Sequence, residues 1–363
     1  MRKIIVIGGS NSVIKDGWTN ELLSIAGEKY DVVNRAIGAS ETCMGIFRLK
    51  TFKDINPGDI VIWEYAVNDN ARAISAIKTR ALVRNVKWFT QICSDNRLYL
   101  VPLIIPLQSA AKTMVRSTYI NSIQEFFSNN NIDYIDGFEA VKSRIHAGDS
   151  LSGIYRDRRH FSSQNSIISD VAKSVFHLCE ELALKGAQNI VKVPEFAGRS
   201  IYVITDFQGS DAHTLKNSIF EGTYYNFCSM LSVRVHGNIL GIIVKRTIFG
   251  ATLLMKTKNM QIKGLCKKSN RTAAVKHKEA KWQIGNLMFE KSFYRKKLSV
   301  NGMLTLTEKG KIGSTLNSAE QPGIIAMVVE TDPKSLSFSL KSQLLKARNL
   351  YRRLRRRFSA SRV

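Results

Sequence analysis

The sequence lacks a cysteine pattern that would support a disulfide framework or a zinc site. Its five cysteines are odd in number, scattered singly and without CxxC spacing: Cys43, Cys93, Cys179, Cys228 and Cys266. Isolated, reduced thiols are typical of the cytoplasm, where disulfides are rare. Cysteine usage therefore predicts a cytoplasmic protein whose fold depends on a hydrophobic core.

Long apolar runs are also missing. None approaches the ~18 residues that a helix needs to span a bilayer. The apolar start of the chain, Ile4 to Ile7, is too short for a signal sequence, and no small-residue cleavage site follows it. From these absences we expect neither a membrane-spanning nor a secreted protein, and we expect the chain to stay in the cytoplasm.

Acidic residues are scarce in the C-terminal third. Residues 245–313 hold 17 Lys and Arg against 3 Asp and Glu, and residues 341–363 hold 9 against none. These two segments account for nearly all of the net charge of +25. Three anionic partners are open: a polyanionic glycan, an anionic membrane surface and nucleic acid. Nucleic acid is the least expected, because no binding motif or stacking-aromatic signature accompanies the charge.

A serine follows the first apolar run. The stretch from Lys3 to Ile7 is rich in β-branched residues and ends in Gly8, Gly9 and Ser10. It predicts a buried strand that enters a tight strand-to-helix turn and leaves the serine near free backbone N–H groups. This arrangement suits a nucleophile, and it also suits a phosphate-binding loop.

The first half of the chain alternates short apolar runs with longer helical patterns. We predict strands over residues 3–8, 31–36, 60–63, 98–103 and 132–135, and helices over 16–28, 70–93, 116–129 and 163–185. The alternation predicts an α/β domain, residues 1–190, with a parallel sheet covered on both faces. Ser10, Gly38 and Asn68 each follow the end of a strand, so three loops should meet at one edge of the sheet.

The pattern changes near Val193 and Pro194. Beyond this boundary the sequence predicts strands over residues 200–207, 232–235, 239–244, 298–306 and 323–329. We expect a basic, mainly-β, sandwich-like domain over residues 195–332. Residues 333–363 read as a basic amphipathic tail, with apolar residues at helical spacing. This tail is either an interfacial helix on anionic lipid or a solvated or disordered basic arm.

Asp157 and His160 stand three residues apart. On one helical turn this spacing puts both side chains on the same side. The carboxylate would fix the imidazole tautomer and stabilise the imidazolium, while the other ring nitrogen takes a proton from a serine. None of the other five histidines has an acid three residues before it.

The order and spacing of four short blocks resemble those of the SGNH (GDSL-type) hydrolase family over roughly residues 1–185. The blocks are Ser10 after the first strand, Gly38 after the second, Asn68 after the third, and Asp157 with His160 before the last helix. The resemblance implies a three-layer, flavodoxin-like α/β fold. It implies that Ser10 is the nucleophile, His160 its general base and Asp157 the residue that orients His160. It also implies an oxyanion hole made of Ser10 N–H, Gly38 N–H and Asn68 Nδ2.

Two residues depart from the pattern of that family. Gly9 stands where the family has an acid before the serine, and Ala66 stands where it usually has glycine. Neither change removes a catalytic atom, but Ala66 would strain its loop if the backbone there needs a positive φ. A catalytically silent copy of the fold that binds a polyanion or a membrane therefore stays open as an alternative.

The activity implied by the resemblance is that of a serine acyl-ester hydrolase, an esterase or deacetylase, with acylated carbohydrate as the expected substrate. A polysaccharide O-acetyltransferase would use the same acyl-enzyme chemistry and is the alternative. Hydrolysis needs no cofactor and no metal, whereas a transferase would take its acyl group from a donor such as acetyl-CoA. We expect the enzyme to work at the cytoplasmic face of the membrane. The carbohydrate substrate is an analogy from the appended β domain.

Several side chains around these motifs have two interpretations. Arg156, Arg158 and Arg159 either bind an anionic substrate or are simply solvated. The residues Trp63, Glu64 and Tyr65 either line a cleft or end a strand, and Asp69 is expected to structure its turn. Four aromatic residues are either sugar-binding platforms or part of a core: Tyr202, Tyr224, Tyr225 and Trp282.

Overall fold

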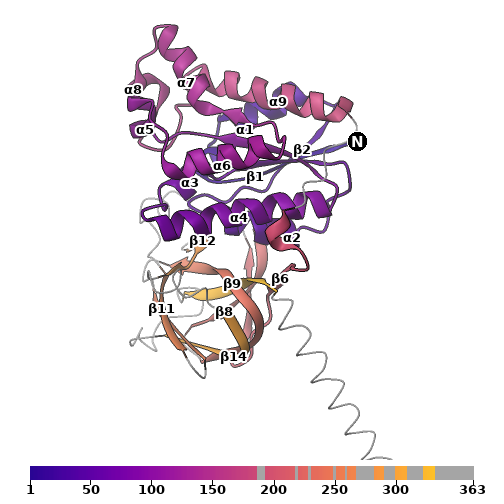
Figure 1. The fold of residues 1–363 in the computed structure, drawn as a ribbon, viewed down its shortest axis with the longest axis vertical. Coiled ribbons are helices and arrows are strands. Elements are labelled where there is room, and N and C mark those ends of the chain that lie inside the picture. Colours follow the sequence, from indigo (N-terminus) through magenta and orange to yellow (C-terminus); the bar gives the residue numbers. More distant parts are fainter. Residues whose placement is uncertain are drawn as a thin grey trace, which may run out of the picture.

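The computed structural model contains a helix-flanked parallel sheet followed by a second, antiparallel sheet (Figure 1). It describes residues 1–185, 193–216, 220–227, 230–247, 251–257, 260–266, 282–289, 299–308 and 322–331. The predicted basic tail, residues 333–363, lies outside these residues, so its role stays a prediction.

The N-terminal sheet has five parallel strands in the order β2-β1-β3-β4-β5. These are β1 Lys3–Gly8, β2 Asp31–Asn34, β3 Ile60–Glu64, β4 Tyr99–Ile104 and β5 Ile135–Asp136. β1 and β3 are neighbours in the sheet, with β2 added beside β1 and with β4 and β5 added beside β3. The loops that follow β1 and β3 therefore leave the sheet close together, at the carboxyl ends of the strands. The predicted α/β class with a parallel sheet is confirmed.

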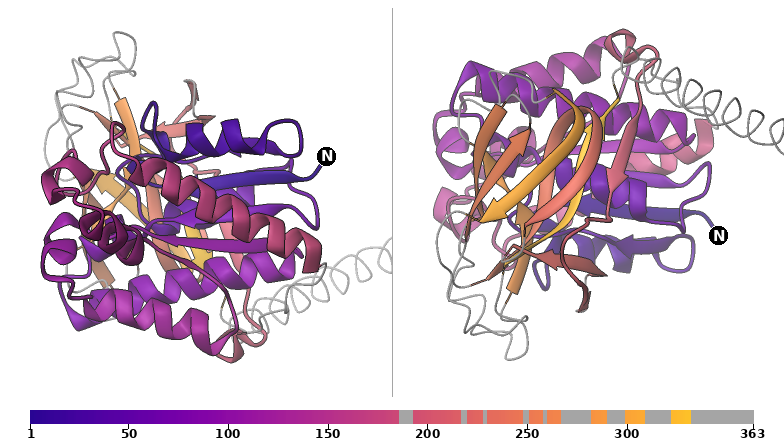
Figure 2. Two further views of the ribbon diagram at one scale, coloured as in Figure 1. Left: turned by 90° about the horizontal axis from the view of Figure 1, so that it is seen from above. Right: turned by 90° about the horizontal axis from the view of Figure 1, so that it is seen from below.

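Helices cover both faces of this sheet, as Figures 1 and 2 show. The side chains of Ile4 and Val6 pack with α1 Trp18–Ala26, α7 Gly137–His146 and α9 Ile167–Lys185. Ile5 and Ile7 point to the other face and pack with α2 Thr42–Thr51, α4 Ala76–Asp95 and α6 Thr118–Asn129. All four β1 side chains are fully buried. Burial of one such side chain stabilises the fold by about 1.5–3 kcal/mol, which is why this short run forms a central strand.

The helix predicted over residues 70–93 is present as α4, but it begins later than predicted, at Ala76, and a separate short helix, α3 Ala66–Asn70, precedes it. The first turn of α4 is capped because the Ser75 side chain accepts the N–H of Lys78. Serine favours this position because its hydroxyl satisfies a free N–H at the start of a helix. Asn68 therefore lies within a short helix that directly follows β3.

The fifth strand is shorter than predicted and begins at Ile135 rather than at residue 132. Asn131 has a left-handed backbone with φ 52°, and the N–H of Ile132 donates to the carbonyl of Phe127. This turn closes α6, so the chain reaches the sheet only three residues later. The last predicted helix also starts later, at Ile167, because the Asn165 side chain accepts the N–H of Ile167.

Asp157 and His160 do not lie on a helical turn, contrary to the prediction. The short helix α8, Leu151–Ile154, ends before them, and Tyr155 and Phe161 pair across the loop that follows. The N–H of Arg156 donates to the carbonyl of His160 at 2.9 Å. Asp157 and His160 therefore meet inside a tight, non-helical loop closed by that bond.

The second domain is mainly antiparallel β-structure, as predicted. Its described strands are β6 Ile201–Ile204, β7 Ala212–Lys216, β8 Glu221–Asn226, β9 Leu231–Thr247, β10 Ala251–Thr257, β11 Met260–Cys266, β12 Trp282–Asn286, β13 Met288–Phe289, β14 Ser299–Glu308 and β15 Gly323–Glu330. They form one hydrogen-bonded network that curls on itself (Figure 2). The two strands predicted over residues 232–235 and 239–244 are parts of β9, whose 17 residues pair with β14, β15 and β12.

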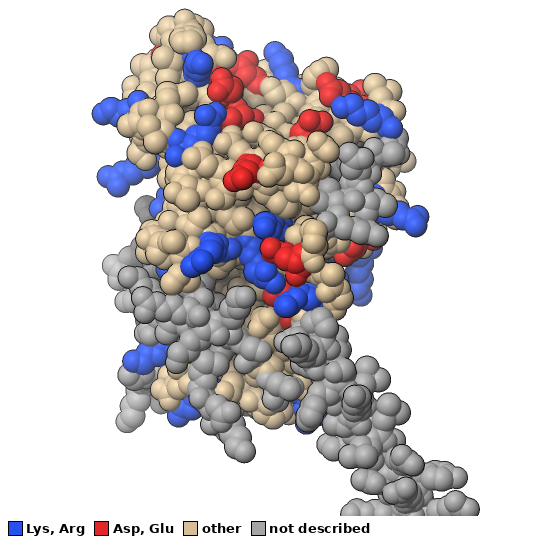
Figure 3. Space-filling view, in the orientation of Figure 1, with Lys and Arg blue, Asp and Glu red and all other residues tan. Residues whose placement is uncertain are grey.

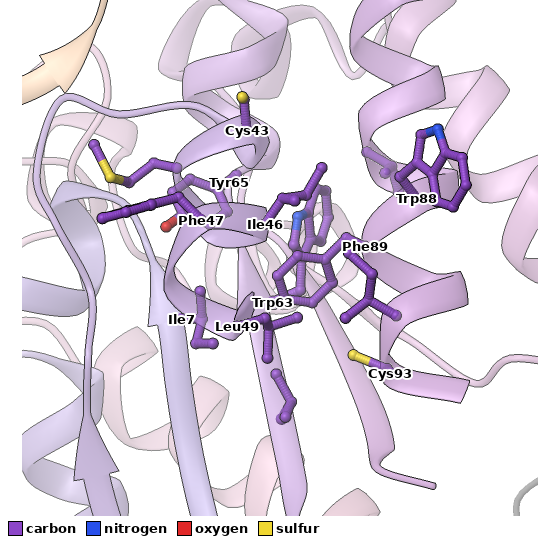
Figure 4. Close-up of a cluster of buried hydrophobic side chains, with 14 of the residues drawn as sticks. Ile7, Cys43, Ile46, Phe47, Leu49, Trp63, Tyr65, Trp88, Phe89 and Cys93 are labelled. Carbon is purple, nitrogen blue, oxygen red and sulfur yellow. The ribbon is translucent and has the colours of Figure 1, made fainter. Parts of the chain in front are cut away.

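The two domains share a hydrophobic cluster. Figure 4 shows part of it, between the parallel sheet and helices α2 and α4. The cluster continues into the second domain, where the ring of Phe196 stacks on Trp88 with centroids 3.8 Å apart. A charged contact closes the same interface, because Arg84 pairs with the buried carboxylate of Glu330. The domains are thus packed against each other.

The described surface is mixed in charge. Figure 3 shows acidic and basic side chains interspersed over the N-terminal half on the face in view. Within residues 245–313, the described basic residues are Lys245, Arg246, Lys256 and Lys263, and the first two are buried. The predicted anionic partner of this segment therefore stays a prediction.

In the described part of the chain, no helix combines the length and the apolar character that crossing a membrane requires.

Candidate active site

Ser10 stands at the carboxyl end of β1, in a single turn of 3-10 helix formed by Ser10–Val13. Its hydroxyl oxygen lies 2.7 Å from Nε2 of His160, across 150 residues of sequence. Glu64, the last residue of β3, holds this turn, because the N–H of Gly9 donates to both the backbone carbonyl and the side-chain carboxylate of Glu64. The structure thus brings the predicted nucleophile and the predicted base into hydrogen-bonding distance.

Asp157 is the partner of His160 on the other side of the ring. His160 Nδ1 lies 2.7 Å from both carboxylate oxygens of Asp157. One of these oxygens also accepts the backbone N–H groups of Arg159 and His160. Burial opposes ionisation of Asp157, but these hydrogen bonds and the imidazole outweigh it and hold the pKa of its carboxyl below its ordinary value. Asp157 is therefore an anion at neutral pH, placed to accept a hydrogen bond from the Nδ1–H of His160.

Asn11 joins the nucleophile turn to the histidine loop, and sequence reasoning missed it. Its Nδ2 donates to the carbonyl of Arg159 at 2.9 Å, and its Oδ1 accepts the N–H of Phe161 at 3.2 Å. Asn11 is 2% exposed. The available sequence signal was weak, since it consists only of a polar residue that directly follows Ser10.

Gly38 and Asn68, the two predicted oxyanion donors, both approach the nucleophile turn. A Cβ placed on Gly38 would lie 3.7 Å from the Cβ of Ser10. The Asn68 side chain is buried, and its Nδ2 has no hydrogen-bond partner among the residues that the structure describes. A buried N–H without a partner is costly in most folds. Here it leaves a donor directed at the turn that carries Ser10.

The structure explains both departures from the family pattern. A Cβ on Gly9 would lie 2.2 Å from Asn68 Nδ2, so position 9 has no room for a side chain while Asn68 keeps this place. Ala66 begins α3 and does not belong to the described residues with a positive φ. Its methyl group is buried without backbone strain. Neither residue disrupts the arrangement around Ser10.

Asp69 follows Asn68 in α3, and its side chain joins α3 to helices α2 and α6. Its carboxylate accepts the N–H of Thr42 at 3.1 Å, the Thr42 hydroxyl at 2.6 Å and the Tyr119 hydroxyl at 2.9 Å. The Thr42 hydroxyl in turn accepts the indole N–H of Trp63. Burial is the main cause that raises the pKa of Asp69, to about 7. Asp69 therefore does more than structure its own turn, because it fixes the start of α2 against α3.

Glu64 is fully buried, directly beneath the turn that carries Ser10. Its neighbours Trp63 and Tyr65 are buried as well, so none of the three side chains lines an open cleft. The carboxylate of Glu64 accepts the hydroxyl of Ser12 at 2.8 Å and the N–H of Gly9 at 3.1 Å. Burial raises the pKa of Glu64 to about 8, against the opposing effect of these two donors. Glu64 therefore joins β3 to the turn that carries Ser10.

The remaining candidates separate into core and surface. Tyr224 and Tyr225 are buried in hydrophobic clusters, which supports the core interpretation. Tyr202 is half-buried and its hydroxyl bonds the backbone of His236, while the side chain of Trp282 lies outside the described residues. Arg156, Arg158 and Arg159 are exposed beside His160, so both of their interpretations stay open.

The described residues include no group of three or more His, Cys, Asp or Glu side chains arranged to hold a metal ion.

A cavity of about 670 Å³ lies between α4 and β9, lined among others by Glu41, Cys43, Ile239 and Asn286. Neither Ser10 nor His160 lines it. The candidate site itself offers a hydroxyl, an imidazole and a carboxylate in sequence, next to N–H donors.

A solved structure has the same arrangement of both domains. It is a two-domain esterase, described as active on acetylated mannans, that matches 91% of this chain and 91% of its own with a TM-score of 0.61. The chain shares the fold of that two-domain esterase. At 10% sequence identity the likeness establishes the fold of the parallel sheet and the C-terminal antiparallel sheet, and nothing beyond the fold.

Other solved structures match about half of the chain. One is a member of the lipolytic protein G-D-S-L family from Veillonella parvula DSM 2008, with a TM-score of 0.41 and 12% identity over 49% of this chain and 99% of that one. Another is the acetyl xylan esterase AlAXEase, with a TM-score of 0.41 and 18% identity over 48% and 98%. No protein-family model matches the sequence, and no curated protein matches it.

Proposed function

We propose that this chain is a serine esterase of SGNH type that removes acyl groups from carbohydrate. The observation that carries the proposal is the chain of contacts from Ser10 through His160 to Asp157, with 2.7 Å at each step. These three side chains come from two loops 147 or more residues apart in the sequence. A geometry of this kind, with the histidine between hydroxyl and carboxylate, is what nucleophilic acyl transfer requires.

In the first half of the reaction Ser10 Oγ attacks the carbonyl carbon of the ester while its proton passes to His160 Nε2. The tetrahedral intermediate then collapses, the bond between the acyl carbon and the sugar oxygen breaks, and His160 returns the proton to that oxygen. Asp157 accepts the Nδ1–H throughout, which fixes the tautomer and stabilises the imidazolium.

In the second half a water molecule attacks the acyl-Ser10 ester. His160 takes one of its protons, the bond to Ser10 Oγ breaks, and the proton passes to Ser10, which releases a carboxylic acid. In both halves the carbonyl oxygen gains negative charge beside Gly38 and Asn68. The unpartnered Asn68 Nδ2 supports a role as oxyanion donor, because a preorganised donor loses no existing bond when that charge appears.

The two-domain architecture supports a carbohydrate substrate. The second domain packs on α2 and contacts α4 through Trp88 and Arg84, and the loops after β1 and β3 lie at one edge of the parallel sheet. The solved two-domain structure with this fold is described as active on acetylated mannans. A short acyl group on a sugar hydroxyl is the corresponding substrate proposed for this chain.

The test compares the wild-type protein with Ser10→Ala on p-nitrophenyl acetate and on an acetylated oligosaccharide. We expect the variant to lose at least ~10³-fold in kcat, since it lacks the attacking atom. A fluorophosphonate should add its mass to Ser10 in the wild type alone. Hydrolysis that is unchanged in Ser10→Ala would reject the proposal, and a wild-type protein without any hydrolysis would favour the catalytically silent binding protein.

A second arm of the test settles the acyl acceptor. The same acyl-Ser10 intermediate can be resolved by water or by a sugar hydroxyl. Incubation with acetyl-CoA and an unacetylated oligosaccharide, followed by mass spectrometry, separates the two routes. We expect release of acetate from acetylated sugar and no gain of ~42 Da on the acceptor, which is the net mass added when an acetyl group replaces a hydroxyl hydrogen.

A further inference from the structure

The loop that carries Gly38, residues 37–42, holds a strained backbone. Ala39 has a φ of 57°, in the left-handed region that non-glycine residues adopt only at a cost. A strained residue keeps such a conformation only where its surroundings impose it. The position of the Gly38 N–H therefore depends on what holds this loop at both ends.

Contacts within the first domain hold the two ends of the loop. At the start, the N–H of Ile37 donates to the carbonyl of Gly8 at 3.0 Å. The Ser40 hydroxyl donates to the carbonyl of Ile37 and closes the turn around Gly38 and Ala39. At the end, Thr42 is bonded to Asp69 through its N–H and its hydroxyl. Glu41 lies between these anchors and precedes the first residue of α2.

The second domain supplies the contact at Glu41. The backbone N–H of Glu41 donates to Oδ1 of Asn286, in β12, at 3.1 Å. Asn286 is 4% exposed, and its own carbonyl accepts a hydrogen bond of 2.7 Å from Arg246 in β9. The side chain that receives the Glu41 N–H is therefore held in place within the β domain.

A second contact presses on the same segment. A Cβ placed on Gly241, in β9, would lie 2.3 Å from Sγ of Cys43, so the strand approaches the start of α2 as closely as a glycine allows. The Glu41 carboxylate also lies 3.6 Å from Nε of Arg72, just after α3. The loop is thus enclosed by the β domain on one side and by the segment after Asn68 on the other.

We propose that Asn286 is a positioning residue that sets the oxyanion loop of the first domain from the second domain. The inference rests on the proposed esterase function. Asn286 does not touch the reacting atoms. It fixes Glu41, which with Ser40 fixes the strained turn and hence the direction of the Gly38 N–H. The β domain then contributes to the rate of the chemical step as well as to the architecture.

This role is distinct from simple docking of the two domains. Docking also depends on the Arg84–Glu330 ion pair and on the stacked rings of Trp88 and Phe196. None of these four residues is bonded to residues 37–42 in the part of the chain that the structure describes. Loss of the Asn286 side chain should therefore leave the domains packed while the loop relaxes.

The experiment uses the full chain with three variants. Asn286→Ala removes the acceptor. Asn286→Asp keeps an oxygen at the same place, and the Nδ2 that it replaces has no hydrogen-bond partner among the described residues. Arg84→Gln weakens the same interface away from the loop. For each protein, kcat and KM on p-nitrophenyl acetate, the rate of fluorophosphonate addition to Ser10 and the Tm are measured.

We expect Asn286→Ala to lower kcat about tenfold or more with KM within about twofold, since removal of an oxyanion donor outright costs ~10²–10³. Fluorophosphonate addition should slow in parallel. Asn286→Asp should retain kcat within about threefold, and Arg84→Gln should keep kcat while lowering Tm. A Ser10-dependent turnover that Asn286→Ala leaves intact, or an equal loss in Arg84→Gln, would overturn this inference alone. Turnover that does not depend on Ser10 would overturn the proposed function, and this inference with it.

Discussion

Asn11 Nδ2 donates a 2.9 Å hydrogen bond to the carbonyl of Arg159, the residue that precedes His160. The other end of the same amide accepts the N–H of Phe161, the residue that follows His160. One side chain, next to Ser10 in sequence, thus holds both flanks of the histidine. This amide therefore joins the turn that carries Ser10 directly to the loop that carries His160.

Replacement of Asn11 by alanine should separate the two loops. The carbonyl of Arg159 and the N–H of Phe161 would lose their partners, which costs about 1–3 kcal/mol for buried groups. We expect a lower free energy of unfolding by that amount and a drop in kcat of about tenfold or more, measured by urea titration and by p-nitrophenyl acetate hydrolysis. Asn11→Asp keeps one acceptor for Phe161 and serves as the matched control. Full activity in Asn11→Ala would show that the histidine loop holds itself.

Gly9 and Asn68 should behave as a coupled pair. A methyl group at position 9 meets Asn68 Nδ2 at 2.2 Å, and the amide at the end of that side chain can swing away at little cost to stability. We therefore expect Gly9→Ala to reduce kcat by about 10²-fold, in the range for loss of one oxyanion donor, with a Tm close to wild type.

The double variant gives the decisive comparison for this pair. In an Asn68→Ala background the collision is gone, so Gly9→Ala should cost little further activity, as is usual for residues that act as a unit. The four proteins compared are the wild type, Gly9→Ala, Asn68→Ala and the double variant. If Gly9→Ala lowers kcat by the same factor with and without the Asn68 side chain, position 9 acts on the turn independently and not through a collision with Asn68.

Glu64 should make stability depend on pH in a predictable direction. Its pKa is raised to about 8 in the folded protein by burial, against about 4.3 in an unfolded chain. Between these values the folded state keeps a proton that the unfolded state has lost, so the contribution of Glu64 to stability falls as the pH rises through this window. Above about pH 8 the effect levels off, and below about pH 4 it is absent.

Glu64→Gln removes this titration while keeping an oxygen for Gly9 and Ser12. Relative to wild type, we expect the Tm of the variant to rise steadily between about pH 5 and pH 8, measured by calorimetry in buffers of constant ionic strength. Asp69 remains in both proteins, so its own raised pKa largely cancels in the comparison. A difference in Tm that is the same at pH 5 and pH 8 would show that Glu64 is ionised throughout.

The sequence by itself determined the parallel sheet and the position of the candidate residues along it. A run such as Ile4–Ile7 can bury both of its faces only inside a covered sheet, and this local pattern needs no knowledge of the rest of the chain. Ser10 and Asn68 could be placed near one edge for the same reason, since both follow central strands. The mainly-β character of the second domain followed equally from short apolar stretches.

Only the tertiary structure decided how these residues meet. Asp157 and His160 are joined by a loop rather than a helical turn, and Asn11 holds that loop from 148 residues away. Glu64 lies beneath Gly9 across 55 residues, and Asn286 reaches Glu41 across 245. Hydrogen bonds over such separations leave no periodicity in the sequence, because they depend on which surfaces are packed together after folding.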